Sequence, residues 1–366
     1  MQIVRHLVLI VLNTAIAILA LLALGWSSLA LWFHIEGAQY LRATGVAAWM
    51  ACLICLVVFI RIRRSWIPWT VLALLAFGFV GWWFTLQPRL DRDWAPDVSR
   101  IVTGRVEGDK VTLDNVRDFE WRTQSDAIER WRTETYDLTE LTETDLVLSY
   151  WGMDAIAHTL ISFGFADGRR VVFSVEIRRE KGEEFSSLAG FFKSYELSLI
   201  AAEERDIIFL RTNMRGEDTY LYPLALPKQT RIALFLNYVQ AGNLLAREPA
   251  FYNTLTANCT TVIFDLAKLI EPGIPMDWRI LLSGYLPSYL AERGALAWHM
   301  PDGSLRRRGA ISEKAKQRPI GVPYSEAIRR SSQAEPSTRG VQSSSEPTAD
   351  AQSPLDRSNT TSRDDR

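Results

Sequence analysis

The sequence lacks the patterns that support metal, nucleotide or nucleic-acid chemistry. Its 366 residues contain four histidines and three cysteines, and these do not occur at the paired spacings of zinc ligands. No Gly-rich loop of the kind that holds phosphates is present. The formal net charge of −1 gives no strong positive field, and no basic stripe with interleaved aromatic residues occurs. We therefore expect no metal ion, no other cofactor and no nucleic-acid partner.

Charged residues are also sparse at the start of the chain, where three apolar runs follow one another. The runs cover residues 7–33, 43–60 and 66–84, and each approaches or exceeds the roughly 20 residues that cross a hydrocarbon core. The first run is too long for the core of a signal peptide, which spans about 7–15 residues. The sequence therefore predicts a membrane anchor with three transmembrane helices over residues 1–86.

The distribution of arginines around these runs indicates how the anchor is oriented. Arg5 precedes the first run, Arg42 lies between the first and second, and the segment before the third run contains Arg61, Arg63 and Arg64. Because loops rich in positive residues stay in the cytoplasm, we expect a cytoplasmic N-terminus and a main domain outside. The predicted location is the bacterial inner membrane, with the main domain in the periplasm.

Beyond the anchor, the composition becomes that of a soluble α+β domain followed by a polar tail. Residues 87–100 form a predicted linker, residues 101–305 a domain of short strands and helices, and residues 306–366 a tail rich in Ser, Pro, Thr, Arg and Asp. Such a tail has too few apolar side chains to offset the entropy of ordering, so we expect it to be largely disordered.

Hairpins and helices are expected to alternate within the domain. An Asp-Gly pair joins the apolar runs 156–165 and 170–177, which is a strong hairpin signal. Residues 206–212 and 219–224 are expected to form a second hairpin. Helices are expected over residues 230–248, 259–269 and 278–293, and the last is expected to be interrupted at Pro287.

Cys259 is the one cysteine of the soluble part, because Cys52 and Cys55 lie inside the second apolar run. In an oxidising compartment cysteines are usually paired, so Cys259 must be a free or intermolecular thiol. It stands directly before an apolar-periodic run and is therefore expected at a helix N-terminus, where the thiol pKa falls and backbone N–H groups stabilise an oxyanion. The alternative interpretation is a small buried hydrophobic residue.

A nucleophilic cysteine needs a base, which is usually histidine. His6 and His34 flank the first apolar run, and His299 follows the last predicted helix. His158 lies within a predicted strand of apolar neighbours, where a buried ring requires a polar partner. His158 is therefore the candidate base, with a purely structural role as the alternative.

The register of the first hairpin decides which residue can orient His158. A three-residue loop makes Leu160 face Ser174, and His158 then faces Glu176. A two-residue loop places Ile177 opposite His158 instead. The strand carries its polar residues on the face of Glu176, which favours the three-residue loop. The alternative partner of Glu176 is an arginine, either Arg178 or Arg211.

Residues 115–329 contain several distinctive segments. They include AHTLISFGFADG, FSVEIRREKGEEFS, EERDIIFLRTN, YLYPL and LSGYLPSYL, and the most specific is FYNTLTANCTT. These segments resemble the bacterial family of the Lnb N-terminal periplasmic domain. The resemblance implies a circularly permuted papain-like thiol fold, an antiparallel sheet with helices, in which histidine precedes cysteine. A similar order occurs in the lecithin retinol acyltransferase group, whose members move acyl groups through an acyl-cysteine.

The resemblance also implies roles for individual residues. Cys259 would be the nucleophile, His158 the general base, and Glu176 or Ser174 the group that orients the base. The candidates for contact with the substrate or oxyanion are Asn258, Thr260, Tyr252, Asn253 and Ser174. The implied activity is that of a lipoprotein N-acyltransferase, which passes an acyl chain to the amino group of a lipidated cysteine.

One feature departs from that lipoprotein acyltransferase, in which the membrane helices follow the periplasmic domain. Here three apolar runs precede the domain, so the specific substrate is left open. We expect a membrane-anchored thiol acyl hydrolase or transferase that acts on lipid or lipoprotein acyl groups. The alternatives are a papain-like cell-wall peptidase or amidase, and a non-catalytic binding module of the envelope.

Overall fold

The computed structural model describes residues 2–63 and 65–330, and it begins with three long apolar helices. Each helix is long and apolar enough to cross a membrane, and they are α1 (Gln2–His34), α2 (Gln39–Ile62) and α3 (Ile67–Thr85). Most of their large side chains are exposed, as expected for helices that contact lipid. The three predicted apolar helices are confirmed, and the protein is a membrane protein.

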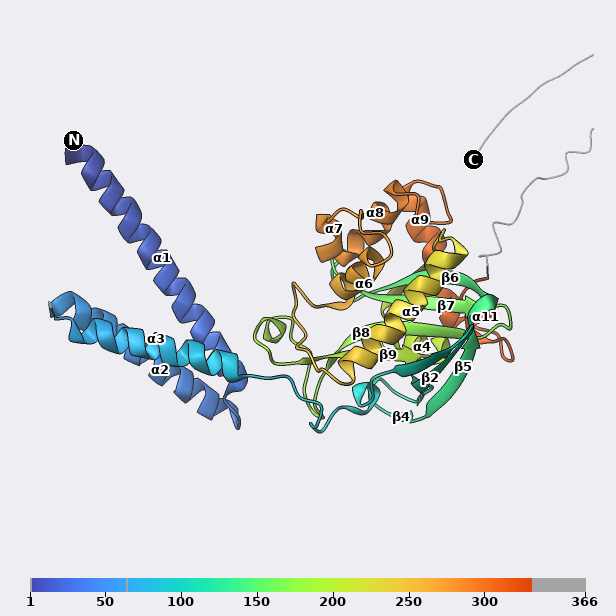
Figure 1. The fold of residues 1–366 in the computed structure, drawn as a ribbon, viewed down its shortest axis with the longest axis horizontal. Helices are drawn as coiled ribbons and strands as arrows, with labels where there is room; N and C mark the ends of the chain where they lie inside the picture. Colours follow the sequence, from blue (N-terminus) through green and yellow to red (C-terminus); the bar gives the residue numbers. More distant parts are fainter. Residues whose placement is uncertain (1, 64, 331–366) are drawn as a thin grey trace, which may run out of the picture. The chain divides into compact units, whose positions relative to one another are not determined.

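A mixed sheet forms the centre of the domain that follows, so the predicted sheet-plus-helix class is confirmed (Figure 1). Its strand order is β1-β2-β9-β8-β7-β6-β10, and β5 also pairs with β2. All pairings are antiparallel except that of β2 with β9. The strands are β1 (Thr103–Glu107), β2 (Lys110–Arg117), β5 (Trp131–Asp137), β6 (Leu141–Tyr150), β7 (Ala157–Phe165), β8 (Arg170–Arg178), β9 (Glu196–Ala202) and β10 (Asp218–Pro223). A separate small ribbon pairs β3 (Glu120–Trp121) with β4 (Ala127–Ile128).

The hairpin of β7 and β8 has the three-residue loop that the polarity of its strands favours. Leu160 pairs with Ser174, and the ladder reaches the loop at Gly164 and Arg170. Gly168 has a φ of 86°, a left-handed conformation that glycine adopts without strain. The predicted register is therefore confirmed, and His158 and Glu176 lie on the same face of the sheet.

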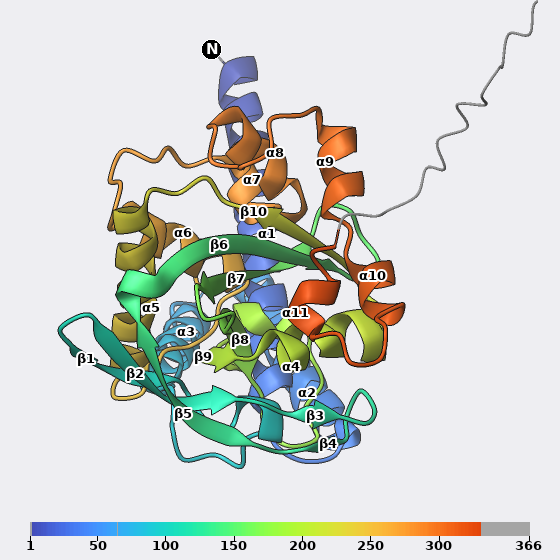
Figure 2. The same ribbon diagram turned by 90° about the vertical axis from the view of Figure 1, so that its right-hand side faces the viewer.

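Helices cover both faces of this sheet (Figure 2). One face packs against α5 (Lys228–Leu245), α6 (Cys259–Lys268), α8 (Leu286–Glu292) and α9 (Asp302–Gly309). The other packs against α4 (Glu204–Phe209), α10 (Ser312–Lys316) and α11 (Tyr324–Ala327). A short helix, α7 (Trp278–Leu281), precedes α8, and the break between them covers residues 282–285. Pro287 does not interrupt a helix as predicted, because it lies in the first turn of α8, where proline is tolerated.

The second predicted hairpin is wrong, because its first half is helical. Helix α4 continues into a π-helical turn, Leu210–Met214, and β10 pairs with β6 instead. The buried carboxylate of Asp206 accepts two hydrogen bonds of 2.9 Å from the guanidinium of Arg117 and one of 2.7 Å from the indole of Trp121. These distant partners hold the segment in a helix despite its strand-like composition.

The folded domain continues to Arg330, beyond the boundary expected at residue 305. Helices α10 and α11 bury Ile311, Ala315, Tyr324 and Ile328 against the second face of the sheet. These few apolar residues are diluted by charged neighbours, which makes the segment resemble a disordered tail in composition. The rest of the expected tail, residues 331–366, lies outside the described residues.

Replacing Ile328 with alanine should therefore destabilise the domain. Loss of a buried isoleucine typically lowers the free energy of unfolding by about 2–5 kcal/mol. Ile320, which is fully exposed nearby, provides the control, and Ile320→Ala should change stability by less than about 0.5 kcal/mol. Denaturant unfolding followed by tryptophan fluorescence measures both variants. Equal stability of the two would contradict the packing of α11 on the sheet.

Candidate active site

Cys259 is the first residue of α6, as the sequence predicts. The side chain of the preceding Asn258 accepts hydrogen bonds of 2.9 Å from the amides of Thr260 and Thr261. The hydroxyl of Thr261 in turn accepts a 2.9 Å bond from the amide of Asn258. This reciprocal capping box fixes the helix start and therefore the position of the thiol.

The thiol lies where two central strands part. The pairing of β7 with β8 ends at Leu160 and Ser174, although β7 begins at Ala157 and β8 continues to Arg178. The amide of Thr159, next to this end of the ladder, donates a hydrogen bond to the sulfur of Cys259. Its hydroxyl lies 3.0 Å from that of Thr260. The start of α6 is thereby joined to β7 at the opening of the sheet.

His158 contacts two polar groups of β8 from the same region. Its Nε2 lies 2.8 Å from Oγ of Ser174 and 3.1 Å from Oε1 of Glu176. The hydroxyl of Ser174 also donates a 2.8 Å hydrogen bond to that carboxylate oxygen. With Nε2 directed at β8, Nδ1 is the ring nitrogen left for the hydrogen bond with Cys259. The structure therefore brings together the four residues expected to act as nucleophile, base and orienting groups.

The electrostatics of this group favour a thiolate and an imidazolium. Burial raises the pKa of Cys259, but the charge of His158 and hydrogen bonds from His158, Thr159 and Thr260 outweigh it, so the pKa is lowered. Burial and the charge of Arg211 lower the pKa of His158, whereas Glu176 and Cys259 raise it, to about 9. Both shifts favour the state in which the ring carries the proton and the sulfur carries the negative charge.

The carboxylate of Glu176 is held ionised by the same neighbours. Burial alone would raise its pKa, but the charges of His158 and Arg211 and the hydrogen bonds from His158 and Ser174 bring it well below its usual value. A carboxylate that stays charged stabilises the imidazolium over the whole working range of pH.

Arg211 is a member of the site that the sequence suggested only as an alternative partner of Glu176. Its Nη2 lies 2.9 Å from Oε1 of Glu176, and its Nη1 lies 3.4 Å from Oε2 of Glu217. The buried guanidinium comes from the π-helical turn after α4, a type of turn that is frequent at functional sites. Glu176 therefore contacts His158 and Arg211 at once, and both interpretations of this carboxylate hold.

The residues expected at the oxyanion mostly shape the loop before the thiol. The side-chain NH₂ of Asn258 donates to the carbonyl of Thr254, and the amide of Thr260 is bound to Asn258. Asn253 accepts hydrogen bonds from the amides of residues 255 and 256. The side chain of Asn258 caps the amides of Thr260 and Thr261 and not that of Cys259. An uncapped N–H group in the first turn of a helix is able to donate a hydrogen bond to an anion.

Tyr252 is buried beneath a neighbouring loop rather than open to a substrate. It packs with Ala189 and Tyr195, and its amide donates to the carbonyl of Tyr195 at 2.9 Å. The close approach requires glycine at position 190, since a Cβ there would lie 2.4 Å from Oγ1 of Thr254. The loop of residues 183–195, here called the apolar loop, therefore lies directly on the segment that precedes the thiol.

Large apolar side chains are exposed on the segments around the thiol. Those on the apolar loop and the adjacent thiol segment are Phe185, Leu188, Phe191 and Leu255. Those on and before α7, which packs against α6, are Met276, Trp278 and Leu281. These side chains are exposed on the loop that covers the thiol segment and on the helix that packs against α6.

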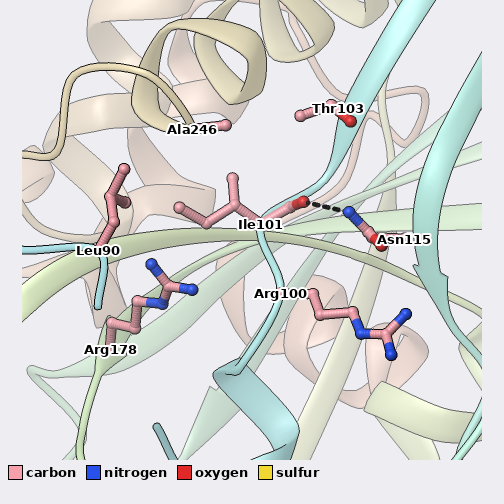
Figure 3. A pocket seen from close by; sticks show the side chains of 7 residues that line it. All are labelled: Leu90, Arg100, Ile101, Thr103, Asn115, Arg178 and Ala246. Atoms are coloured by element: carbon pink, nitrogen blue, oxygen red, sulfur yellow. Dashed lines mark hydrogen bonds between the residues drawn. The ribbon is translucent and has the colours of Figure 1, made fainter. Parts of the chain in front are cut away.

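A hollow of about 470 Å³ elsewhere in the domain contains none of these site residues (Figure 3). The side chain of Arg178 lines this hollow. Its guanidinium donates hydrogen bonds to the carbonyls of Val98 and Ser99 and lies over the ring of Trp94. Arg178 thus fastens the linker to β8, and it is not the partner of Glu176. Among the described residues, no group of three or more His, Cys, Asp or Glu side chains is placed to hold a metal ion.

Comparison with known proteins supports the resemblance seen in the sequence. The family model of the Lnb N-terminal periplasmic domain matches residues 127–284, a segment that contains the whole Cys259–His158–Glu176 group. No curated protein and no solved structure gives a significant match. Together, the family match and the three apolar helices indicate a membrane-associated protein with a domain of periplasmic type.

The pH dependence of thiol alkylation tests this electrostatic arrangement. Iodoacetamide should label Cys259 at a lower pH than an ordinary thiol, because the pKa of Cys259 is lowered. In Glu176→Gln the pKa of His158 falls, less imidazolium stabilises the thiolate, and the acid limb of labelling should move up by about one pH unit.

The control for that experiment is Glu180→Gln. Glu180 pairs with Arg92 rather than with the histidine, so its removal should leave the labelling profile unchanged. A wild-type profile in Glu176→Gln, or labelling that begins only near the ordinary thiol pKa of about 8.5, would contradict the thiolate–imidazolium pair.

Proposed function

We propose that this protein is a membrane-anchored thiol acyl hydrolase or acyltransferase of the bacterial inner membrane, with its papain-like domain in the periplasm. The observation that carries the proposal is the contact of Cys259 at the start of α6 with His158, whose other ring nitrogen faces Ser174 and Glu176. A lowered thiol pKa, a paired base and an orienting carboxylate are the requirements of cysteine nucleophilic catalysis.

The reaction begins with attack of the Cys259 thiolate on the carbonyl carbon of an ester or amide. A C–S bond forms, and the negative charge moves to the carbonyl oxygen, where the amide of Cys259 donates a hydrogen bond. The bond to the leaving group then breaks, and the imidazolium of His158 gives its proton to the departing oxygen or nitrogen. The product of this half is an acyl-cysteine thioester and a neutral imidazole.

The second half returns the enzyme to its starting state. Water or an amine attacks the thioester carbonyl, and His158 takes the proton of this nucleophile as a general base. The C–S bond breaks, and the sulfur leaves as a thiolate beside the restored imidazolium. Water gives a free fatty acid, whereas the amino group of a lipidated cysteine gives an N-acyl lipoprotein. Glu176 remains ionised throughout and holds the ring through Nε2.

Contacts between the domain and the membrane helices support a lipid or lipoprotein substrate. Nε2 of His34, at the end of α1, lies 2.6 Å from the carbonyl of Phe192. Nζ of Lys193 donates to the carbonyl of Trp83 near the end of α3 at 3.0 Å. The apolar loop that makes these contacts also binds the thiol segment, because Thr254 donates to the carbonyl of Ser187 at 2.7 Å.

A cell-wall peptidase or amidase is the competing enzyme class, and the exposed apolar side chains around the thiol disfavour it. Peptidoglycan is polar, and a groove that binds it gains little from Phe185, Leu188 or Trp278 at the surface. A non-catalytic binding module is the competing non-enzyme class. It needs no lowered thiol pKa, no opposing histidine and no capped helix start beneath the thiol.

Trapping of the acyl-enzyme tests the proposed function. The full-length protein in detergent, mixed with phospholipid, should acquire one acyl mass on Cys259 that hydroxylamine removes. Cys259→Ala should abolish the adduct, and His158→Ala should slow its formation by about 10²–10⁴-fold. Cys52→Ala, which removes a thiol of the membrane anchor, provides the control and should behave as wild type.

Three results would separate the proposal from its alternatives. An adduct that forms equally well in Cys259→Ala would exclude Cys259 as the nucleophile. Release of peptides from purified peptidoglycan, with no acyl adduct from lipid, would favour the peptidase. Complementation of a deletion strain by Cys259→Ala would favour the binding module.

A further inference from the structure

A groove of about 320 Å³ lies between the three helices of the membrane anchor. Its walls come from α1, α2 and α3, and they are Leu31, Trp49, Leu74, Leu75, Gly78, Phe79 and Trp82. No wall residue is charged, and the only side-chain polar atoms of the wall are the indole nitrogens. The indole nitrogen of Trp49 already has a partner, because it donates a 3.0 Å hydrogen bond to the hydroxyl of Ser27 in α1.

The surroundings of the groove favour an acyl chain as its occupant. The three helices are long and apolar enough to cross a membrane, so the medium around them is hydrocarbon. Helix α2 packs against both α1 and α3. Figure 1 shows α1 diverging from α2 and α3 toward its N-terminal end. Gly78 borders open space in the groove, because an added Cβ there would meet no atom within 4 Å.

A series of ring contacts and one hydrogen bond to the backbone connects the groove with the segment before the thiol. The ring of His34 stands edge-on to that of Trp82 at 5.6 Å, and its Nε2 contacts the backbone of Phe192. Phe192 stacks on Phe33 at 5.5 Å. Phe33 in turn packs against the cluster that contains Tyr252, seven residues before Cys259. The groove therefore lies near the end of the anchor that contacts the domain with the thiol.

The boundary between anchor and domain holds a cation suited to a phosphate. Nζ of Lys193 donates to the carbonyls of Trp83 and Leu86 and lies over the ring of Trp83. Burial lowers its pKa, and no carboxylate of the described chain offsets that effect. Lys193 has a φ of 54°, a left-handed conformation that is uncommon outside glycine and that other contacts must maintain.

We propose that this groove is the binding site for an acyl chain of the phospholipid substrate, whose phosphate lies beside Lys193 and whose ester lies at the thiol. The proposal rests on the proposed function and deepens it, since it assigns the membrane anchor a role in substrate binding. The anchor is then part of the active site rather than a tether alone.

Filling the groove at Gly78 tests this assignment. Gly78→Leu places a side chain in the groove, whereas Gly81→Leu adds the same side chain to α3 at another open position that does not line it. With the full-length proteins in phospholipid nanodiscs, Gly78→Leu should slow acyl-enzyme formation by about tenfold, the loss of roughly two buried methylene contacts. Gly81→Leu should react at the wild-type rate.

Two further measurements distinguish an effect on acyl-chain binding in the groove from an effect on the reactivity of the thiol. A short water-soluble ester does not need the groove, so it should acylate Cys259 equally fast in both variants and in wild type. A phospholipid with a photoreactive acyl chain should cross-link to groove residues in wild type and in Gly81→Leu, but not in Gly78→Leu.

The outcomes separate failure of the groove from failure of the function. If the thioester forms from phospholipid at the wild-type rate in Gly78→Leu, the groove assignment is overturned while the thiol chemistry stands. If the short ester and the phospholipid both fail to acylate wild type, the proposed function is overturned. If no lipid cross-links to the groove in any variant, an acyl chain does not occupy it, and the proposal is overturned as well.

Discussion

The pairing of Cys259 with His158 depends on one constraint, which is the parting of β7 and β8 beyond Leu160 and Ser174. A continuous ladder would leave no room for the start of α6 at this point. Because the strands part, a helix from one side of the sheet meets a histidine and a carboxylate from the other. The cap on α6 and the ion pair of Glu176 with Arg211 fix the two sides of this contact.

Features set by local chemistry could be predicted from the sequence. The apolar runs define the membrane helices, and the Asn-Cys-Thr-Thr sequence defines the start of α6. The alternation of polar residues along β8 defines the register that brings Glu176 opposite His158. Each depends on residues within one element or one hairpin, so the pattern contains the information needed.

Features set by distant partners could not be predicted in the same way. The segment of α4 has a strand-like composition, and its helical form depends on the buried contact of Asp206 with Arg117, 89 residues away. Because residues 206–212 were expected to form a strand, the sequence did not show how Arg211 reaches Glu176. The segment with Tyr324 has the composition of a disordered tail. Its folding depends on packing against a distant face of the sheet, which the local sequence does not show.

Ionisation of Cys259 tests most directly whether the parted strands create a reactive thiol. The ultraviolet absorbance of the thiolate, taken as the difference between the full-length protein and Cys259→Ser over a pH titration, measures it without a substrate. A lowered pKa predicts that the thiolate absorbance appears below the ordinary thiol pKa, and that this transition shifts upward in His158→Ala. A single transition near the ordinary thiol pKa of about 8.5, unchanged by His158→Ala, would contradict the pairing.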